Sequence, residues 1–98
     1  MQKIHFDKKT LEGFCETHHI IFLGLFGSVI TPHFKPASDV DILVRFEPNN
    51  LPSLFEMADM EMELTKLVGR PVDLRTPNDL SPYFRDEVLK NVQVQNSR

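Results

Sequence analysis

The apolar run from Ile20 to Phe26 constrains the fold of this chain more than any other segment. It contains no charged or polar side chain and ends at Gly27-Ser28. A short continuous apolar run of this kind is typical of a β-strand that is covered on both faces. The sequence therefore predicts a sheet with this strand in its interior and with helices packed on it.

The segments around this strand predict helices that alternate with further strands. Asp7 is a suitable cap for a helix from about Lys8, and Phe6 and Leu11 have the spacing of a hydrophobic staple around that cap. We expect a turn of helix at most and then a loop from 29 to 38, because Pro32 and Pro36 interrupt this segment. Further strands are predicted at 39–46 and 71–74, and an edge strand at 92–94.

The longest predicted helix begins after Asn49 or Asn50 and ends at Gly69. Its apolar residues form a stripe at helical spacing, consisting of Leu51, Leu54, Phe55, Ala58 and Met62. Three more residues widen this face, namely Met57, Met60 and Leu64. The acidic residues are then left for solvent, namely Glu56, Asp59, Glu61 and Glu63.

A third helix is predicted from Ser81-Pro82 to Asn91, with Phe84, Val88 and Leu89 on its buried side. Helices that alternate with strands indicate the α/β class, as a small mixed sheet with helices packed on it. The length of 98 residues fits a single domain, 1–98.

Composition and charge exclude several classes of partner. Apolar residues make up 41% of the chain, and no run is long enough to span a membrane. The net charge is −3 and the basic residues are scattered, so we expect no nucleic-acid partner. Cys15 is the one cysteine, and the amino terminus lacks a secretion signal, so we expect a cytoplasmic location.

Asp39 and Asp41 are the residues most suggestive of chemistry. Side chains alternate along a strand, so both carboxylates project from one face. At roughly 6 Å and an effective dielectric constant of about 20, their repulsion is about 3 kcal/mol. A bound divalent cation removes this cost, and oxygen ligands without paired histidine or cysteine favour magnesium or manganese. The alternative is a solvated edge strand, but the apolar 42–44 that follows favours a central one.

Gly27, Ser28 and Asp73 complete the candidate site. A glycine at the end of a buried strand lets backbone approach a phosphate, and the following hydroxyl can bond its oxygen. Asp73 lies between two apolar residues of a predicted strand and is the best third carboxylate for a two-metal site. The alternatives are an ordinary turn for Gly27-Ser28 and a surface residue at a strand end for Asp73.

These residues match the pattern Gly-Ser, ten residues, then Asp-x-Asp. In this the chain resembles the minimal nucleotidyltransferase family of the DNA polymerase beta superfamily. The resemblance also includes the strand before Gly27, the block 38–44, and Val72-Asp73-Leu74 with the helix that follows it. It implies the nucleotidyltransferase fold and covers most of the chain beyond the first twenty residues.

By this resemblance Asp39, Asp41 and Asp73 are catalytic and bind two Mg²⁺ ions, while Gly27 and Ser28 bind the triphosphate of ATP. Asp73 would also help to deprotonate the acceptor. The resemblance further implies transfer of AMP to a partner protein, a toxin of the helical HEPN family, so that the chain acts as an antitoxin in a toxin–antitoxin pair. Homo-oligomers and hetero-oligomers both remain open.

One departure from the family pattern leaves a second function open. The family often has arginine and glycine after Gly-Ser, whereas this chain has Val29-Ile30-Thr31-Pro32, with His33 and Lys35 as substitute cations. The alternative is a binding module with little or no turnover that neutralises its partner by forming a complex. Transfer to a small molecule is a third, weaker reading, because no second domain shapes a pocket.

The remaining conspicuous residues are given structural roles. His18-His19 is interpreted as a polar helix end and not as a metal site. The methionines Met57, Met60 and Met62 are interpreted as core, with an adaptable partner surface as the alternative. Tyr83 and Phe84 are interpreted as structural.

Overall fold

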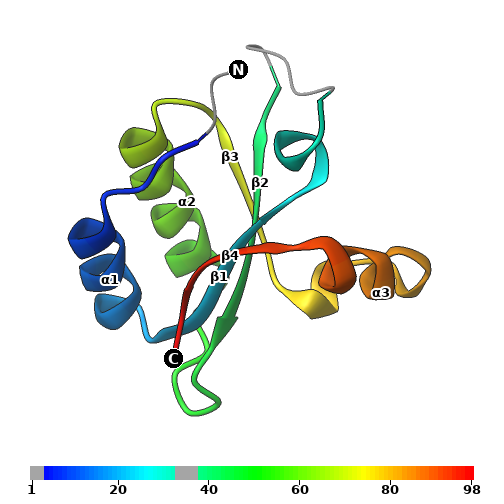
Figure 1. Cartoon of the computed structure of the whole chain (residues 1–98). Helices are drawn as coiled ribbons and strands as arrows, with labels where there is room; N and C mark the ends of the chain where they lie inside the picture. Colours follow the sequence, from blue (N-terminus) through cyan, green and yellow to red (C-terminus); the bar gives the residue numbers. More distant parts are fainter. Residues whose placement is uncertain (1–3, 33–37) are drawn as a thin grey trace.

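The computed structural model describes residues 4–32 and 38–98 and has the predicted α/β architecture (Figure 1). The elements follow one another as α1 (Lys8–Thr17), β1 (Ile20–Phe26), the 3-10 helix η1 (Gly27–Ile30), β2 (Val40–Phe46), α2 (Leu54–Val68), β3 (Val72–Arg75), the 3-10 helix η2 (Pro77–Asp79), α3 (Pro82–Asn91) and β4 (Gln93–Ser97). Pro36, which was expected to interrupt the segment from 29 to 38, lies outside the described residues. The substitute cations His33 and Lys35 lie outside them as well.

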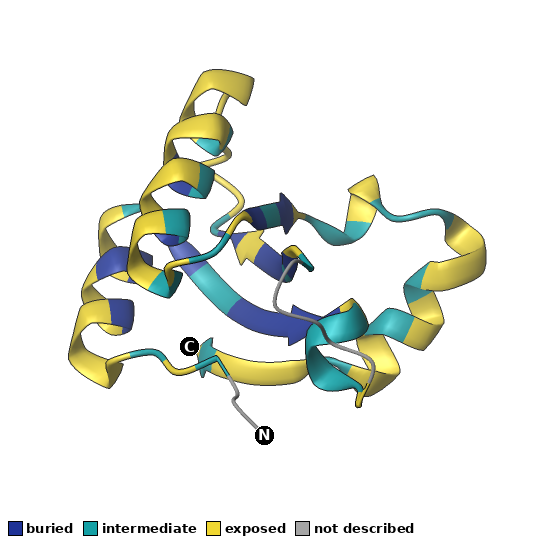
Figure 2. Ribbon diagram, turned by 90° about the horizontal axis from the view of Figure 1, so that it is seen from above, coloured by how far each residue is buried: buried dark blue, intermediate teal, exposed yellow. Residues whose placement is uncertain are grey.

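The four strands form one mixed sheet in the order β3-β2-β1-β4. β1 pairs antiparallel with β2 and with β4, whereas β2 and β3 are parallel. The interior position predicted for Ile20–Phe26 is thus confirmed. Helices α1 and α2 lie side by side against one face of the sheet, and α3 extends away from the other side (Figures 1 and 2).

The core lies between that face of the sheet and the two helices. Ile42, Val44 and Ile20 have no exposed surface, and Leu11, Phe14 and Cys15 of α1 pack against the same cluster. Asp7 caps α1, because its carboxylate accepts a hydrogen bond of 3.0 Å from the backbone N–H of Thr10. Figure 2 shows the buried residues of the helices turned toward the strands.

Helix α2 buries a different face from the predicted one. Met60 and Leu64 are its buried residues, whereas Leu54 is 87% exposed and Phe55 84% exposed. Leu51 and Met62 are exposed as well, so the predicted stripe was wrong. The start was also wrong: Ser53 caps the helix in a capping box with Glu56, and Asn49 and Asn50 precede it.

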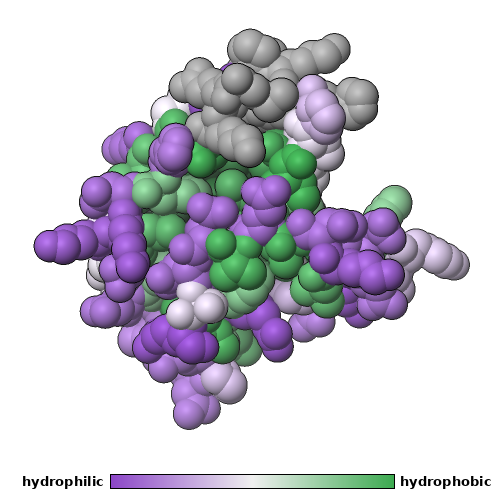
Figure 3. Space-filling view, in the orientation of Figure 1, coloured by the Kyte–Doolittle hydropathy of each residue, from purple (hydrophilic) through white to green (hydrophobic). Residues whose placement is uncertain are grey.

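Helix α3 has the predicted bounds but not the predicted burial. It contains no buried residue: Phe84 and Leu89 are exposed, and Tyr83 is 93% exposed, so the structural roles expected for Tyr83 and Phe84 were wrong. The edge strand after it is longer than predicted and continues to Ser97. Hydrophobic surface also gathers in the middle of the face drawn in Figure 3, over β4.

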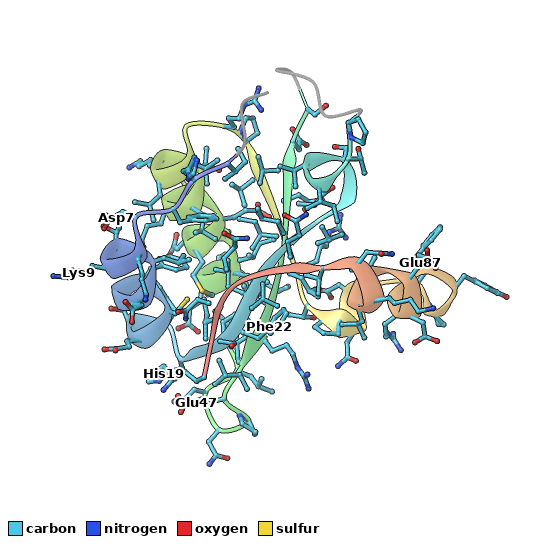
Figure 4. All side chains as sticks on the ribbon, viewed as in Figure 1. Asp7, Lys9, His19, Phe22, Glu47 and Glu87 are labelled. Carbon is cyan, nitrogen blue, oxygen red and sulfur yellow. The ribbon has the colours of Figure 1, made fainter. Side chains whose placement is uncertain are left out.

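The polar helix end predicted at His18-His19 is confirmed. His19 has a φ of 59° and closes the turn into β1, and its ring nitrogen Nδ1 lies 3.0 Å from a carboxylate oxygen of Glu47 (Figure 4). The ring nitrogen Nε2 of His18 lies 3.3 Å from Glu63. Neither histidine is near the candidate site residues. Among the described residues, no helix is long and apolar enough to cross a membrane.

Candidate nucleotide and metal site

The sheet register places Asp41 and Asp73 side by side. The two residues are paired across the parallel strands β2 and β3, in line with Phe26 at the end of β1. Asp39 directly precedes β2 and is exposed, while Asp41 and Asp73 are partly buried. Strand alternation turns Asp41 away from its neighbours Val40 and Ile42, which have no exposed surface in the helix-covered core. Three predicted acidic residues therefore gather at one end of the sheet.

Asp41 is the carboxylate whose electrostatic surroundings are least favourable. Partial burial raises the pKa of Asp41 above its ordinary value of 3.8, and the negative charges of Asp73 and Asp39 raise it further. The positive charge of Arg75 acts in the opposite direction. Like charges in a partly desolvated place disfavour the ionised form, and a cation would reverse this effect.

Gly27 fits closely against Asp41. Its φ of 75° lies in the left-handed region, and a Cβ atom built at this position would collide with the carboxylate oxygen Oδ2 of Asp41. The backbone conformation therefore favours glycine here, and a larger residue would also displace the neighbouring carboxylate. The absence of a side chain leaves the backbone at Gly27 and the Asp41 carboxylate next to each other.

Ser28 lies in the first turn of η1 and is partly exposed. Its carbonyl oxygen accepts hydrogen bonds from the backbone N–H of Thr31, at 2.9 Å, and from the Thr31 hydroxyl, at 2.8 Å. These bonds fix the short turn that was predicted after Gly27. The Ser28 hydroxyl is thereby carried on a defined backbone beside Gly27.

The carboxylate of Asp73 binds Arg75, which follows two residues later on the same face of β3. The guanidinium Nε lies 3.2 and 3.3 Å from the two carboxylate oxygens of Asp73, and Nη2 lies 3.1 Å from one of them. This ion pair raises the pKa of Arg75. Sequence analysis missed Arg75, although its spacing from Asp73 was a usable signal.

Two side chains of α2 hold β3 in place from its outer edge. The backbone N–H of Leu74 donates to Oε2 of Glu61 at 2.8 Å, and that of Val72 donates to the hydroxyl of Thr65 at 3.1 Å. Glu61 was predicted to need only water, and this was wrong. Because the two bonded N–H groups flank Asp73 in sequence, they fix the strand that carries it.

Hollows lie on both sides of the carboxylates. Gly27 borders one of about 480 Å³, whose opposite wall is formed by α3 and β4. Asp73 and Arg75 border another of about 650 Å³, which has an apolar wall that includes Phe46 and Leu54. Gly27 and Asp73 thus each border a hollow on the surface.

The chemistry of these side chains fits a hard divalent cation, since every candidate donor is a carboxylate oxygen. Over residues 4–32 and 38–98, no group of three or more His, Cys, Asp or Glu side chains is already arranged to hold a metal ion. The Asp73 carboxylate is instead held in an ion pair with Arg75. The pair Asp39 and Asp41 is left with mutual repulsion that a cation would relieve.

Comparison with known proteins identifies the family of the chain. The nucleotidyltransferase domain family matches residues 7–94 of the chain. The protein adenylyltransferase MntA of Thermococcus cleftensis is 40% identical over 70 residues, which cover 71% of this chain and 69% of that protein.

Solved structures have the same fold. A structure assigned to the minimal nucleotidyltransferases is 30% identical to this chain and has a TM-score of 0.68. The match covers 90% of this chain and 95% of that one. A toxin–antitoxin structure with AMP-PNP has a TM-score of 0.74 at 16% identity, over 95% of this chain and 75% of that one. The fold and the site residues thus point to the same class of protein.

Proposed function

Because the chain belongs to the minimal nucleotidyltransferases and is a nucleotidyltransferase, we propose that it transfers AMP from ATP to a protein acceptor in a magnesium-dependent reaction. The observation that carries this proposal is the meeting of Gly27, Asp41 and Asp73 at one end of the sheet. The name of its relative in Thermococcus cleftensis, a protein adenylyltransferase, supports a protein as the acceptor.

Each site residue has a role in the proposed reaction. The backbone at Gly27 lets the triphosphate approach, and the Ser28 hydroxyl donates a hydrogen bond to a phosphate oxygen. Asp39, Asp41 and Asp73 would hold Mg²⁺, which supplies neutralisation of the negative charge on the phosphates. Asp73 also accepts the proton of the acceptor hydroxyl. The acceptor oxygen bonds to the α-phosphorus, the bond from that phosphorus to the bridging oxygen breaks, and pyrophosphate leaves.

The proposed acceptor is a small helical toxin of the HEPN family, which makes the chain an antitoxin. Support comes from the likeness of the fold to MntA of the MntA–HepT toxin–antitoxin structure, at a TM-score of 0.66 and 15% identity. The exposed apolar residues of α2 and α3 offer contact surface for such a partner, among them Leu54, Phe55, Tyr83 and Phe84.

The test is incubation of the purified protein with Mg²⁺, ATP labelled at the α-phosphate, and the partner. We expect label in the partner and a mass increase of one or more adenylate units. Replacement of both Asp39 and Asp41 by asparagine should lower the rate of adenylate transfer at least about a hundredfold. Asp59→Asn, on the exposed side of α2, should leave this rate unchanged. Absence of label, together with continued neutralisation of toxicity by the Asp39 and Asp41 double alanine variant, would refute the enzymatic proposal.

A second candidate function is a binding module that masks its partner without turnover. The observation that favours it is the uncharged segment Val29–Pro32, where the family often has arginine. Calorimetry separates the two functions. Magnesium-dependent binding of ATP without transfer favours the module, and the absence of both binding and transfer counts against the nucleotide site itself.

A further inference from the structure

Arg75 is a cation in direct contact with one of the carboxylates of the proposed site. It forms the three hydrogen-bond contacts to Asp73, and it is the positive charge that opposes the raised pKa of Asp41. The register pairs Arg75 with Leu43, two residues beyond the pair of Asp41 and Asp73. Its guanidinium therefore extends back along β3 toward the carboxylates.

The ion pair is only partly shielded from water. The side chain of Arg75 is 47% exposed and that of Asp73 is 36% exposed. Ion pairs with this exposure contribute little to stability, so exchanging one partner for another anion costs little. Both residues also border the hollow of about 650 Å³, so a ligand can reach them.

Resting on the function proposed above, we propose that Arg75 is a phosphate-binding residue of the nucleotide site. Without nucleotide, Arg75 neutralises Asp73 and competes with a metal ion for it. When a metal–nucleotide complex binds, Asp73 turns to the metal and Arg75 exchanges the carboxylate for a phosphate oxygen of the nucleotide.

The chemistry of arginine suits this exchange. The planar guanidinium offers paired N–H donors that match a phosphate as well as a carboxylate. The segment from Gly27 to Pro32, which the structure describes, contains no lysine or arginine. Arg75 offers such a cation from strand β3, where it lies beside Asp73.

Two binding measurements by calorimetry test the proposal, with Mn²⁺ alone and with AMP-PNP in the presence of Mg²⁺. For Arg75→Ala we expect Mn²⁺ alone to bind several-fold more tightly, because Asp73 is released. The same variant should bind Mg²⁺–AMP-PNP about tenfold more weakly, as expected for a lost charge-assisted hydrogen bond. Arg75→Lys should recover part of the nucleotide affinity. The affinities for Mn²⁺ and for AMP-PNP shift in opposite directions only if Arg75 both neutralises Asp73 and binds a phosphate of the nucleotide.

The matched control is Arg45→Ala, since Arg45 is exposed on β2 and borders the same hollow. Thermal unfolding of each variant verifies the fold. Equal losses of AMP-PNP affinity in Arg45→Ala and Arg75→Ala would indicate a general effect of charge and would overturn the proposal. Unchanged affinities in Arg75→Ala, or tighter binding of both probes, would also overturn it. If the unmodified protein binds no AMP-PNP, the proposed nucleotidyl transfer fails as well.

Discussion

Gly27 lies so close to Asp41 that any side chain at residue 27 would displace the Asp41 carboxylate. A Cβ there would collide with Oδ2 of Asp41, and the φ of 75° disfavours any residue other than glycine. The antiparallel register explains the contact, because Phe26 is paired with Asp41 and Gly27 follows directly. The Gly-Ser part and the Asp-x-Asp part of the motif are therefore two halves of one packed unit.

Alanine substitutions at three glycines should distinguish the cost of backbone strain at Gly27 from the cost of its contact with Asp41. We expect Gly27→Ala to lose roughly 2 kcal/mol or more of the free energy of unfolding. Gly69→Ala should lose about 1 kcal/mol, because Gly69 has a similar φ of 79° but nothing within 4 Å of its Cβ position. Gly13→Ala, in the middle of α1 with open space around it, should gain stability. Urea denaturation measures all three, and equal losses at Gly27 and Gly69 would argue against the contact with Asp41.

The charge on Asp41 should make stability depend on pH. The pKa of Asp41 is raised in the folded protein. Its favourable contribution to the free energy of unfolding is therefore fully present below the ordinary pKa of 3.8 and is lost as the pH rises through the raised pKa. Asp41→Asn removes this pH-dependent loss of stability, because asparagine does not ionise. After allowance for solvent screening, we expect the variant to be more stable at pH 7 by about 1 kcal/mol or less, and the advantage to vanish near pH 3. Thermal melts across this range test it; an advantage that grows on acidification would contradict the assignment.

The motif could be predicted from the sequence because its geometry is mostly local. Alternation along β2 fixes which way Asp41 points, and the apolar run before Gly27 identifies an interior strand. The meeting of Asp41 and Asp73 also follows once β2 and β3 are parallel neighbours. The helix bounds were predictable where caps are strong, as at Asp7, Gly69 and Ser81.

The buried face of α2 was not predictable from its periodicity. The helix carries two stripes at helical spacing, one through Leu54 and Ala58 and the other through Met57, Met60 and Leu64, and both are apolar. Only the second faces the sheet. The choice depends on the side chains of the strands beneath, and so does the contact of Glu61 with β3. Such contacts between elements are not encoded in the pattern of one element.

Alanine substitutions on the two stripes should differ sharply in their effect on stability. Leu64 has no exposed surface, so Leu64→Ala should lower the free energy of unfolding by about 2–5 kcal/mol. Leu54 is 87% exposed, and Leu54→Ala should change it by less than about 0.5 kcal/mol. Chemical denaturation of the isolated protein distinguishes them. A large loss at Leu54 in the isolated protein would mean that the exposed stripe is covered within the molecule.

Glu61 should act as a positioning residue, because it reaches the site only through β3. Its carboxylate accepts the backbone N–H of Leu74 at 2.8 Å, next to Asp73 in the chain. We expect Glu61→Ala to lose about 1 kcal/mol of stability, the usual contribution of such a bond, and to weaken metal–nucleotide binding by loosening β3. Glu61→Gln keeps an acceptor oxygen and should restore most of both properties. The exposed Asp59 of the same helix provides the control, as Asp59→Ala removes a carboxylate without touching β3. Hydrogen exchange at the Leu74 amide gives a readout independent of activity: protection should fall in Glu61→Ala and return in Glu61→Gln. If protection falls equally in both variants, the charge of Glu61 rather than its hydrogen bond holds the strand, and the positioning role assigned to this bond is wrong.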